Sequence, residues 1–462
     1  MKTREERRNL TLGLQVRTWL VSALDHRYAV PAIILGGVML RLIVLAQLAP
    51  KGLLSDAASY NTMASQLHSG ERFIPFWPPG VPLYLASIRG LFGSEQWISR
   101  ASMLVFYVGL SIAISRLVFF LTSRGWASSV AVTFLAFAPA FILASLETTT
   151  ELPTAMLLAA LTLMLVNEET SESFARYWSI GIVLGCLVLV RSANVVLLVP
   201  VPLFLFFRKK SFLALTPVVV MPLAIVACWI GFVAHQTGRV VMINTSNAKN
   251  LYLGNSERTP LYRTWWLGSH HDAHEMLPSG ADPQKMDPIV LNAEYGRLAA
   301  SAISQHPFLF VLRTFNRICV YLALDTFTGA YVIESYGYPK LLGFCIIALD
   351  ALVYAAAVFG SICFVATQRG GIRSAGAPWV ILAVVLLYAV PYFISFSHPR
   401  YHFPTLPLLL ALSVSFAAKI IGEERALIRE LIVLRMRWVV AAFAVFSFVQ
   451  LEFVYVVSKH LN

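Results

Sequence analysis

The polar stretch after the first hydrophobic segment carries a carboxylate where chemistry at a membrane surface would need one. Asp56 follows Ser55 at the start of a predicted helix, and the rigid sequence FWPPG at 76–80 leads back toward the next apolar segment. A carboxylate beside a bilayer can act as a general base for an acceptor hydroxyl. The helix macrodipole alone also favours an acidic residue at this position, so a purely structural role for Asp56 stays open.

A second acidic pair occurs in the sequence LETTTELP at 146–153. Glu147 and Glu151 are four residues apart, so they share one face if the stretch is helical. Two carboxylates at the same membrane depth as Asp56 suggest paired roles, although a solvated turn that caps the next segment explains them equally. The candidate catalytic residues are therefore Asp56, Glu151 and Glu147.

Three cations suit the opposite task, the binding of a phosphate. Arg191 ends an apolar segment, Arg400 lies in the polar junction SHPRYH, and Lys249 belongs to an amide-rich loop. A guanidinium can clamp a phosphate through two hydrogen bonds. Such cations could also stabilise a lipid phosphate as a leaving group. Each arginine could instead extend to the lipid headgroups and do nothing more.

Two further loops contain residues with chemical potential. The sequence NAKNLYLGN at 247–255 supplies amides, a glycine turn and a lysine, which suit either sugar and phosphate binding or an ordinary turn. The sequence HHDAHE at 270–275 gathers metal-binding residue types, but its spacing matches no closed zinc pattern and favours a solvated loop. These residues require no cofactor, and a divalent metal stays open.

The elements that position these residues are membrane-spanning helices. Hydrophobic residues make up 58% of the 462 and charged residues only 13%, with a mean hydropathy of +0.69. A soluble fold of this length could not bury so much apolar surface, so we expect an all-α polytopic membrane protein. The candidate spans are 29–49, 97–121, 127–145, 152–166, 178–190, 193–207, 212–235, 339–366, 377–396, 404–421 and 437–457. This makes about eleven spans, with a range of 10–13.

Basic clusters predict the orientation of the spans. The N-terminal arm 1–28 is basic and has no cleavage site, so we expect it to be retained in the cytoplasm. The long polar loops 50–96 and 236–338 then lie outside. Residues 29–421 are expected to form one catalytic module of the membrane. Residues 422–462 are expected to form a basic cytoplasmic loop and the last span.

Helices outside the spans are expected in both long loops. Residues 56–69 have an amphipathic pattern, which predicts a helix along the membrane surface. Helical periodicity returns at 288–304. The segment 306–327 is apolar except for Arg313 and Arg317, which share one face and are expected to keep their guanidinium groups among the headgroups.

The formal net charge of +12 does not require nucleic acid as a partner. The basic residues are spread over predicted cytoplasmic loops and span ends. This distribution is typical of membrane topology and of contact with anionic lipid headgroups.

Taken in order, four stretches carry a resemblance to a known family. They are Ser55-Asp56 to Tyr60 with Gly70 and PPGVP at 78–82; Thr150-Glu151; LGN at 253–255 with His306-Pro307; and PRYHFP at 399–404. The chain resembles the membrane-embedded GT-C fold glycosyltransferases that use polyprenyl-phosphate sugars. It is most similar to the bacterial branch related to protein O-mannosyltransferases and lipid A aminoarabinose transferases (glycosyltransferase family 39-like).

This resemblance implies an inverting sugar transfer on the outer face of a bacterial inner membrane. Asp56 would help to deprotonate an acceptor hydroxyl of a glycan, lipid or protein, and Glu151 would be the second acidic site. The departing lipid phosphate would be neutralised by Arg400, Lys249 or Arg191. The remaining candidates for donor contact are Tyr60, Asn255, Tyr401 and His402.

One departure and several alternatives remain. The aminoarabinose transferases carry a Glu-Lys-Pro motif in the first loop, where this chain has FWPPG, which puts that sugar in doubt. A polymerase or ligase of lipid-linked glycans would also need cations on the outer face. A transporter or flippase would place ionisable residues within its spans, whereas these spans are nearly uncharged at their centres. A scaffolding protein would not need the acidic and basic sites.

Overall fold

The computed structural model describes residues 21–48, 53, 55–167, 174–209, 212–259, 265–266, 269–270, 285–368, 376–421, 433 and 436–451. The helices are α2 (Ala29–Leu48), α3 (Ser55–Ser69), α4 (Gly80–Phe92), α5 (Gln96–Ser102), α6 (Leu104–Thr122), α7 (Gly125–Phe137), α8 (Pro139–Ala144), α9 (Glu151–Val166), α10 (Phe174–Val190), η3 (Ser192–Leu198), α11 (Pro200–Lys209), α12 (Phe212–Thr237), α13 (Asn247–Asn255), α14 (Pro288–Gln305), α15 (Pro307–Leu322), α16 (Phe327–Glu334), α17 (Lys340–Ala366), α18 (Ala377–Ile394), η5 (Pro399–Thr405) and α19 (Leu406–Ile421). A further apolar helix spans Met436–Leu451. Two short strands, β1 (Trp265–Trp266) and β2 (Ser269–His270), pair antiparallel.

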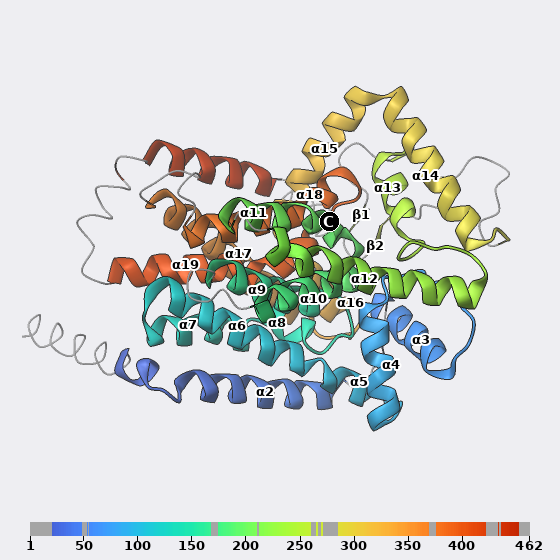
Figure 1. Ribbon diagram of the computed structural model, residues 1–462. Coiled ribbons are helices and arrows are strands. Elements are labelled where there is room, and N and C mark those ends of the chain that lie inside the picture. The colour runs from blue at the N-terminus through green and yellow to red at the C-terminus, as the bar shows by residue number, and fades with distance from the viewer. Residues whose placement is uncertain are drawn as a thin grey trace, which may run out of the picture.

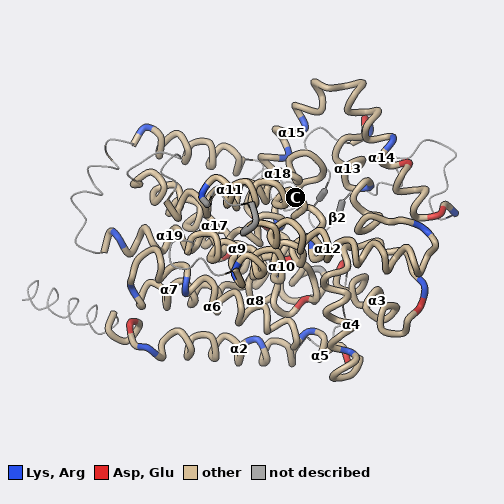
Figure 2. The backbone as a smooth tube through the Cα atoms, viewed as in Figure 1, with Lys and Arg blue, Asp and Glu red and all other residues tan. Residues whose placement is uncertain are grey.

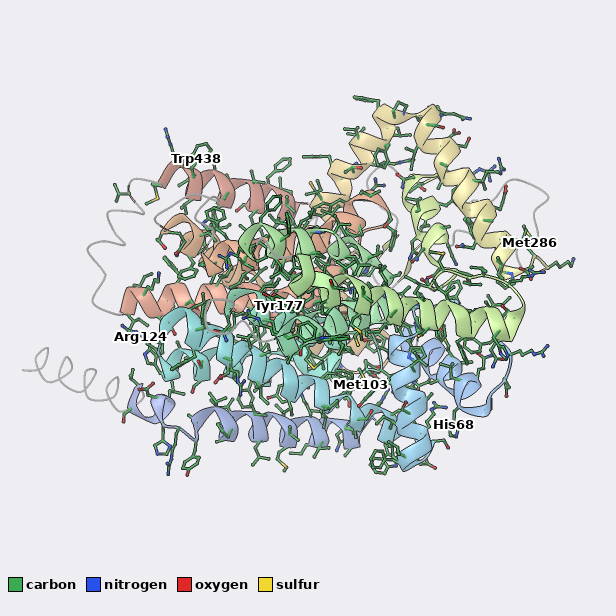
Figure 3. The ribbon with its side chains drawn as sticks, in the orientation of Figure 1. His68, Met103, Arg124, Tyr177, Met286 and Trp438 are labelled. Carbon is green, nitrogen blue, oxygen red and sulfur yellow. The ribbon has the colours of Figure 1, made fainter. Side chains whose placement is uncertain are left out.

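The long apolar helices run side by side, and the loop helices gather at one end of them (Figure 1). α2, α6, α7 and α19 lie alongside one another, whereas α3, α13 and α14 lie at the common end. Charged residues are sparse along the long helices (Figure 2). Side chains fill the space between helices, with Tyr177 near the centre and Trp438 at the margin (Figure 3). Tyr177 is accordingly 5% exposed and Trp438 65%.

Many helices in the described part of the chain are apolar enough to enter a membrane. Six are long and apolar enough to cross one, or seven if the bent pair α15–α16 counts as a single span. The chain is therefore an all-α polytopic membrane protein, as its composition predicts. The expected spans coincide with apolar helices or with broken pairs such as α7–α8. How many of them cross remains a prediction.

The apolar face of α3 is covered by protein. Tyr60 and Ala64 pack with Val81 of α4, and Met63 packs with Trp229 of α12. Gly70, which follows the helix, has a φ of +71°, the left-handed conformation that ends many helices. The amphipathic pattern thus predicts the helix correctly, but its apolar stripe contacts α4 and α12, which fixes Asp56 relative to the bundle.

The expectation for Arg313 and Arg317 is wrong. Both are about 95% buried, and both guanidinium groups point into the protein. Phe308, Val311 and other apolar residues occupy the outer face of α15 instead. The reason is that Arg313 and Arg317 donate to backbone carbonyls at the end of α13, which have no partner within their own helix.

Ionisable residues well inside α2 and α17 qualify the expectation of uncharged span centres. Arg41 of α2 is fully buried, lies 3.7 Å from the ring centroid of Tyr107 and donates to the carbonyls of Leu135 and Ala136. Asp350 of α17 accepts from the backbone nitrogen of Ala140. Both therefore satisfy the open end of a neighbouring helix.

Candidate active site

The first-loop residues meet the end of α10 because a glycine allows close approach. A Cβ at Gly80 would lie 2.6 Å from the backbone nitrogen of Val190. Any larger residue at position 80 would therefore separate the start of α4 from the residue before Arg191. This contact brings the aromatic pair Phe76 and Trp77 next to Arg191.

A cavity of about 810 Å³, here called the larger cavity, lies at this junction. Its cations are Arg191, Lys249 and Arg400, and its carboxylates are Asp56 and Glu151. Its aromatic residues are Tyr60, Phe76, Trp77, Tyr392, Phe396 and Tyr401. Its apolar lining includes Val195, Val196, Val390 and Ile394 from η3 and α18. The cavity therefore combines phosphate-binding groups, flat rings and an apolar side.

Asp56 and Arg400 form the central ion pair of the site. Arg400 Nη2 donates to Asp56 Oδ2 at 2.5 Å, although 344 residues separate the two in sequence. Arg400 Nε lies 4.0 Å from Glu151 Oε1, and the guanidinium lies 4.8 Å from the ring centroid of Phe327. Arg400 does not extend away from the protein, because both carboxylates hold it in the site.

Arg191 forms a second ion pair close to the first. Its Nη2 donates to Glu151 Oε1 at 2.9 Å, and its Nη1 donates to the hydroxyls of Tyr388 at 2.7 Å and Tyr392 at 3.3 Å. Glu151 thus links the two arginines. A planar guanidinium suits this arrangement, because its donors lie in one fixed plane.

Tyr60 supplies a neutral donor beside these charges. Its ring lies 5.6 Å from that of Trp77, and the residue is 5% exposed. Burial, together with the negative charges of Asp56 and Glu151, raises the pKa of Tyr60. The hydroxyl therefore keeps its proton at physiological pH.

A second cavity, here called the smaller cavity, lies on the other side of the Asp56–Arg400 pair. Its volume is about 80 Å³, and it shares Asp56, Glu151 and Arg400 with the larger cavity. Glu147 and Asp325 line only the smaller of the two. Its other lining residues include Ala140, Leu143, Ala144, Phe327, Tyr331 and Phe403. Asp56, Glu151 and Arg400 therefore form a wall between a basic cavity and an acidic, mostly apolar one.

Glu147 is not part of a solvated turn, nor does it share a helical face with Glu151. Residues 147–150 are not helical, and Glu147 is 8% exposed. It accepts from the Tyr336 hydroxyl and lies 3.5 Å from Arg100 Nη2. Burial raises the pKa of Glu147, against the opposing effects of Arg100 and Tyr336.

The loop that precedes α13 is tied to the first loop. Thr245 N donates to Pro75 O at 2.9 Å, and Asn244 Nδ2 donates to Phe76 O at 3.2 Å. Gly254 allows α13 to touch the end of α18, since a Cβ there would lie 1.6 Å from Ser395 O. These contacts place Lys249 in the larger cavity, 5.8 Å from the ring centroid of Phe76.

The structure places two candidate donor contacts outside the larger cavity. Asn255 is 3% exposed, and its amide donates to Leu251 O and Ile394 O. His402 is 4% exposed and bonds through Nδ1 to Tyr321 O. Neither side chain therefore lines the larger cavity.

The described residues do not fit a divalent metal at the wall. No group of three or more His, Cys, Asp or Glu among them is arranged to hold a metal ion. Asp56 and Glu151 are instead each held by an arginine, which occupies the position a cation would need. Most of the histidine-rich sequence at 270–275 lies outside the described residues.

Comparison with known proteins supports the resemblance. Residues 77–233 of the 462 match the family model described as dolichyl-phosphate-mannose-protein mannosyltransferase. The match covers about a third of the chain and confirms the resemblance to GT-C glycosyltransferases, while the bacterial branch stays a prediction. Among curated protein sequences, no significant match is found.

Two similar solved structures come from Archaeoglobus fulgidus. One is a crystal structure of an oligosaccharyltransferase in complex with Zn and sulfate, with a TM-score of 0.45 and 13% identity over 90% of this chain and 52% of that one. The other is the oligosaccharyltransferase AglB in complex with an inhibitory peptide and a dolichol-phosphate, with a TM-score of 0.40 and 12% identity over 91% and 55%. This chain therefore spans about half the length of each.

Proposed function

We propose that this protein is a membrane glycosyltransferase that moves a sugar from a polyprenyl-phosphate donor to an acceptor hydroxyl. The observation that carries the proposal is the shared wall of Asp56, Glu151 and Arg400 between two cavities of opposite character. One cavity suits an anionic donor and the other a neutral acceptor. The family described as using dolichyl-phosphate mannose supports a lipid-phosphate donor.

The donor occupies the larger cavity in this proposal. Arg191, Arg400 and Lys249 hold the phosphate, because each can give it a charge-assisted hydrogen bond. Trp77 and Tyr60 lie where a sugar ring would need flat apolar contacts and a hydroxyl donor. The apolar residues of η3 and α18 suit the first units of the prenyl chain.

Transfer occurs across the wall, with inversion. The acceptor oxygen approaches the anomeric carbon from the smaller cavity while the phosphate departs into the larger one. Arg191 and Arg400 take up the negative charge that develops on the phosphate oxygen. Asp56 holds Arg400 at 2.5 Å and presents its other oxygen to the acceptor hydroxyl.

We propose that the protein lies in a bacterial inner membrane, with its N-terminus in the cytoplasm and its site on the outer face. Residues 1–28 then form a cytoplasmic arm, 29–421 the catalytic module, and 422–462 a basic loop with the last span. The acceptor is a glycan, lipid or protein that carries a free hydroxyl.

The test is sugar transfer in membranes that contain the wild type or Asp56→Asn. Radiolabelled polyprenyl-phosphate hexose is added, and label is followed into lipid and polymeric products. Wild type should transfer label, and Asp56→Asn should reduce transfer by at least about 100-fold.

Asp287→Asn is the matched control. Asp287 is half-buried at the start of α14, where it pairs with Arg239 and lines neither cavity. Asn can also accept the hydrogen bonds from Ile289 N and Val290 N. It should therefore transfer like wild type. The proposal would be contradicted if wild type transferred no sugar from any polyprenyl-phosphate donor but used a diphosphate-linked oligosaccharide. That result would favour a polymerase or ligase.

A further inference from the structure

The smaller cavity contains a fourth carboxylate, Asp325, that the sequence motifs do not mark. Asp325 lies in the short break between α15 and α16, whose axes differ by 66°. Its Oδ1 accepts from Phe327 N at 2.8 Å, which places the carboxylate at the start of α16. Phe327 in turn packs on Arg400. The break therefore brings Asp325 to the wall between the cavities.

Asp325 differs from the other three carboxylates of this cavity in its charge balance. Asp56 is paired with Arg400 at 2.5 Å, Glu151 with Arg191 at 2.9 Å, and Glu147 with Arg100 at 3.5 Å. Within the part of the chain that the structure describes, no Lys, Arg or His nitrogen lies within 4.0 Å of the Asp325 carboxylate. Among the described carboxylates of this cavity, Asp325 is therefore the one whose oxygens are not engaged in an ion pair.

The surroundings of Asp325 strengthen this contrast. Ala140, Thr328 and Phe403 line the smaller cavity beside it and continue into an inner cavity of about 20 Å³. Asp350, Tyr354 and His402 line that inner cavity, which has room for about one water molecule. Burial among apolar walls is the largest influence and disfavours a negative charge on Asp325, and the charge of Glu151 acts in the same direction. The hydrogen bond from Phe327 N and the charge of Arg400 oppose these effects.

The imidazole of His402 faces this region as an acceptor. Its Nδ1 lies 2.9 Å from Tyr321 O, and a carbonyl oxygen can only accept, so Nδ1 carries the proton. Nε2 of the neutral ring then has a free electron pair. His402 thus adds no positive charge beside Asp325, and Tyr354, stacked 4.0 Å from the ring, adds none either.

We propose that Asp325 is the group that receives the proton of the acceptor hydroxyl during sugar transfer. This inference rests on the proposed function. The acceptor O–H bond breaks and its proton passes to a carboxylate oxygen of Asp325, while the acceptor oxygen forms a bond to the anomeric carbon. The bond from that carbon to the phosphate oxygen breaks, and its electron pair leaves with the polyprenyl phosphate. Asp325 then returns the proton to that phosphate or to water.

Asp56 keeps a different task in this scheme. It orients Arg400 through their ion pair and accepts a hydrogen bond from the acceptor hydroxyl. The family resemblance implies that Asp56 helps to remove the proton. In this scheme Asp56 orients the acceptor and Asp325 receives the proton. Asp325 acts on the acceptor only, so its loss should leave donor binding intact.

The experiment compares Asp325→Asn, Asp325→Glu and the control Asp287→Asn in purified full-length protein. In Asp325→Asn the side-chain carbonyl can still accept from Phe327 N, so this variant preserves the contact at the start of α16. Asp325→Asn should lose about 100-fold or more in transfer rate, Asp325→Glu should retain a measurable part, and Asp287→Asn, which lines neither cavity, should resemble wild type. Thermal stabilisation by added polyprenyl phosphate should be equal in all of them.

The outcomes separate the two proposals. If wild type transfers sugar and Asp325→Asn transfers equally well, the role of Asp325 is refuted while the proposed function stands. The role is also refuted if Asp287→Asn loses as much as Asp325→Asn, or if Asp325→Asn loses stabilisation by polyprenyl phosphate. If wild type neither transfers sugar nor is stabilised by polyprenyl phosphate, the proposed function fails and takes this inference with it.

Discussion

Arg317 provides a direct test of how the long loop 236–338 is held to the bundle. Its Nε donates to Phe393 O at 2.6 Å, and its Nη1 donates to Gly254 O at 2.6 Å and to Asn255 Oδ1 at 3.1 Å. One side chain of α15 thus joins the end of α13 to the end of α18. Replacement by methionine keeps the apolar stem and removes every one of these donors.

The expected cost follows from the acceptors that lose a partner. Each buried acceptor left without its donor costs about 1 kcal/mol or more, and removal of a buried cation returns part of its desolvation cost. We expect a net local loss of about 3 kcal/mol. The change in Tm equals the loss of free energy divided by the entropy of unfolding, which is large for a chain of this size. The loss therefore lowers Tm by only about 3 °C. The same energy raises the local opening constant of α13 by about 100-fold.

Hydrogen exchange measured by mass spectrometry is therefore the more sensitive assay. Amides of α13 should exchange about 100-fold faster in Arg317→Met than in wild type, with those of α6 unchanged. Arg297→Met is the matched control, because Arg297 is exposed and, among the described residues, bonds only to Glu294 three residues away. If both variants exchange alike, Arg317 would lie among lipid headgroups after all, and the inward orientation of α15 would be wrong.

Two further predictions concern the site itself. Arg191→Lys removes the planar guanidinium that bonds to Glu151, Tyr388 and Tyr392 together. The protein should still fold, but the KM for the donor should rise about tenfold. An unchanged KM would mean that Arg191 does not contact the donor. Glu147 has a pKa raised by burial above its ordinary value of 4.5, so its contribution to stability is complete below that pH and is lost as the pH rises. Glu147→Gln should therefore weaken the fall of Tm with rising pH from about 4.5 upward, and an unaltered slope would show that Glu147 is not the titrating group.

The sequence predicts the helices well, because each depends on local properties. Apolar runs give α2, α12, α17 and α18, and the spacing of Tyr60, Met63 and Ala64 gives α3. The sequence also predicts that four charged residues lie in the same region, because each stands at a polar junction between apolar segments. These residues are Asp56, Glu151, Arg191 and Arg400. Their pairing could not be predicted, because a pair such as Asp56 and Arg400 is set by how distant helices pack.

The errors have the same physical origin. A helical wheel shows that Arg313 and Arg317 share a face, but it does not show whether that face meets lipid or the carbonyls of α13. The relation of Glu147 to Glu151 depended on a helix that the three threonines between them do not form. Asp325 escaped notice because its neighbours in sequence are unremarkable. Its significance comes from Arg400 and Phe403, which lie more than 70 residues away.

The wall that both cavities share also bears on fidelity. A sugar activated by a departing phosphate reacts with whichever oxygen nucleophile stands opposite, and water is always the most abundant competitor. In the proposed reaction, water must be kept from the smaller cavity when no acceptor occupies it, and apolar side chains such as Leu143, Ala144 and Phe403 line that cavity. If the proposed function holds, these apolar side chains would limit wasteful hydrolysis of the donor, a role separate from binding of the phosphate.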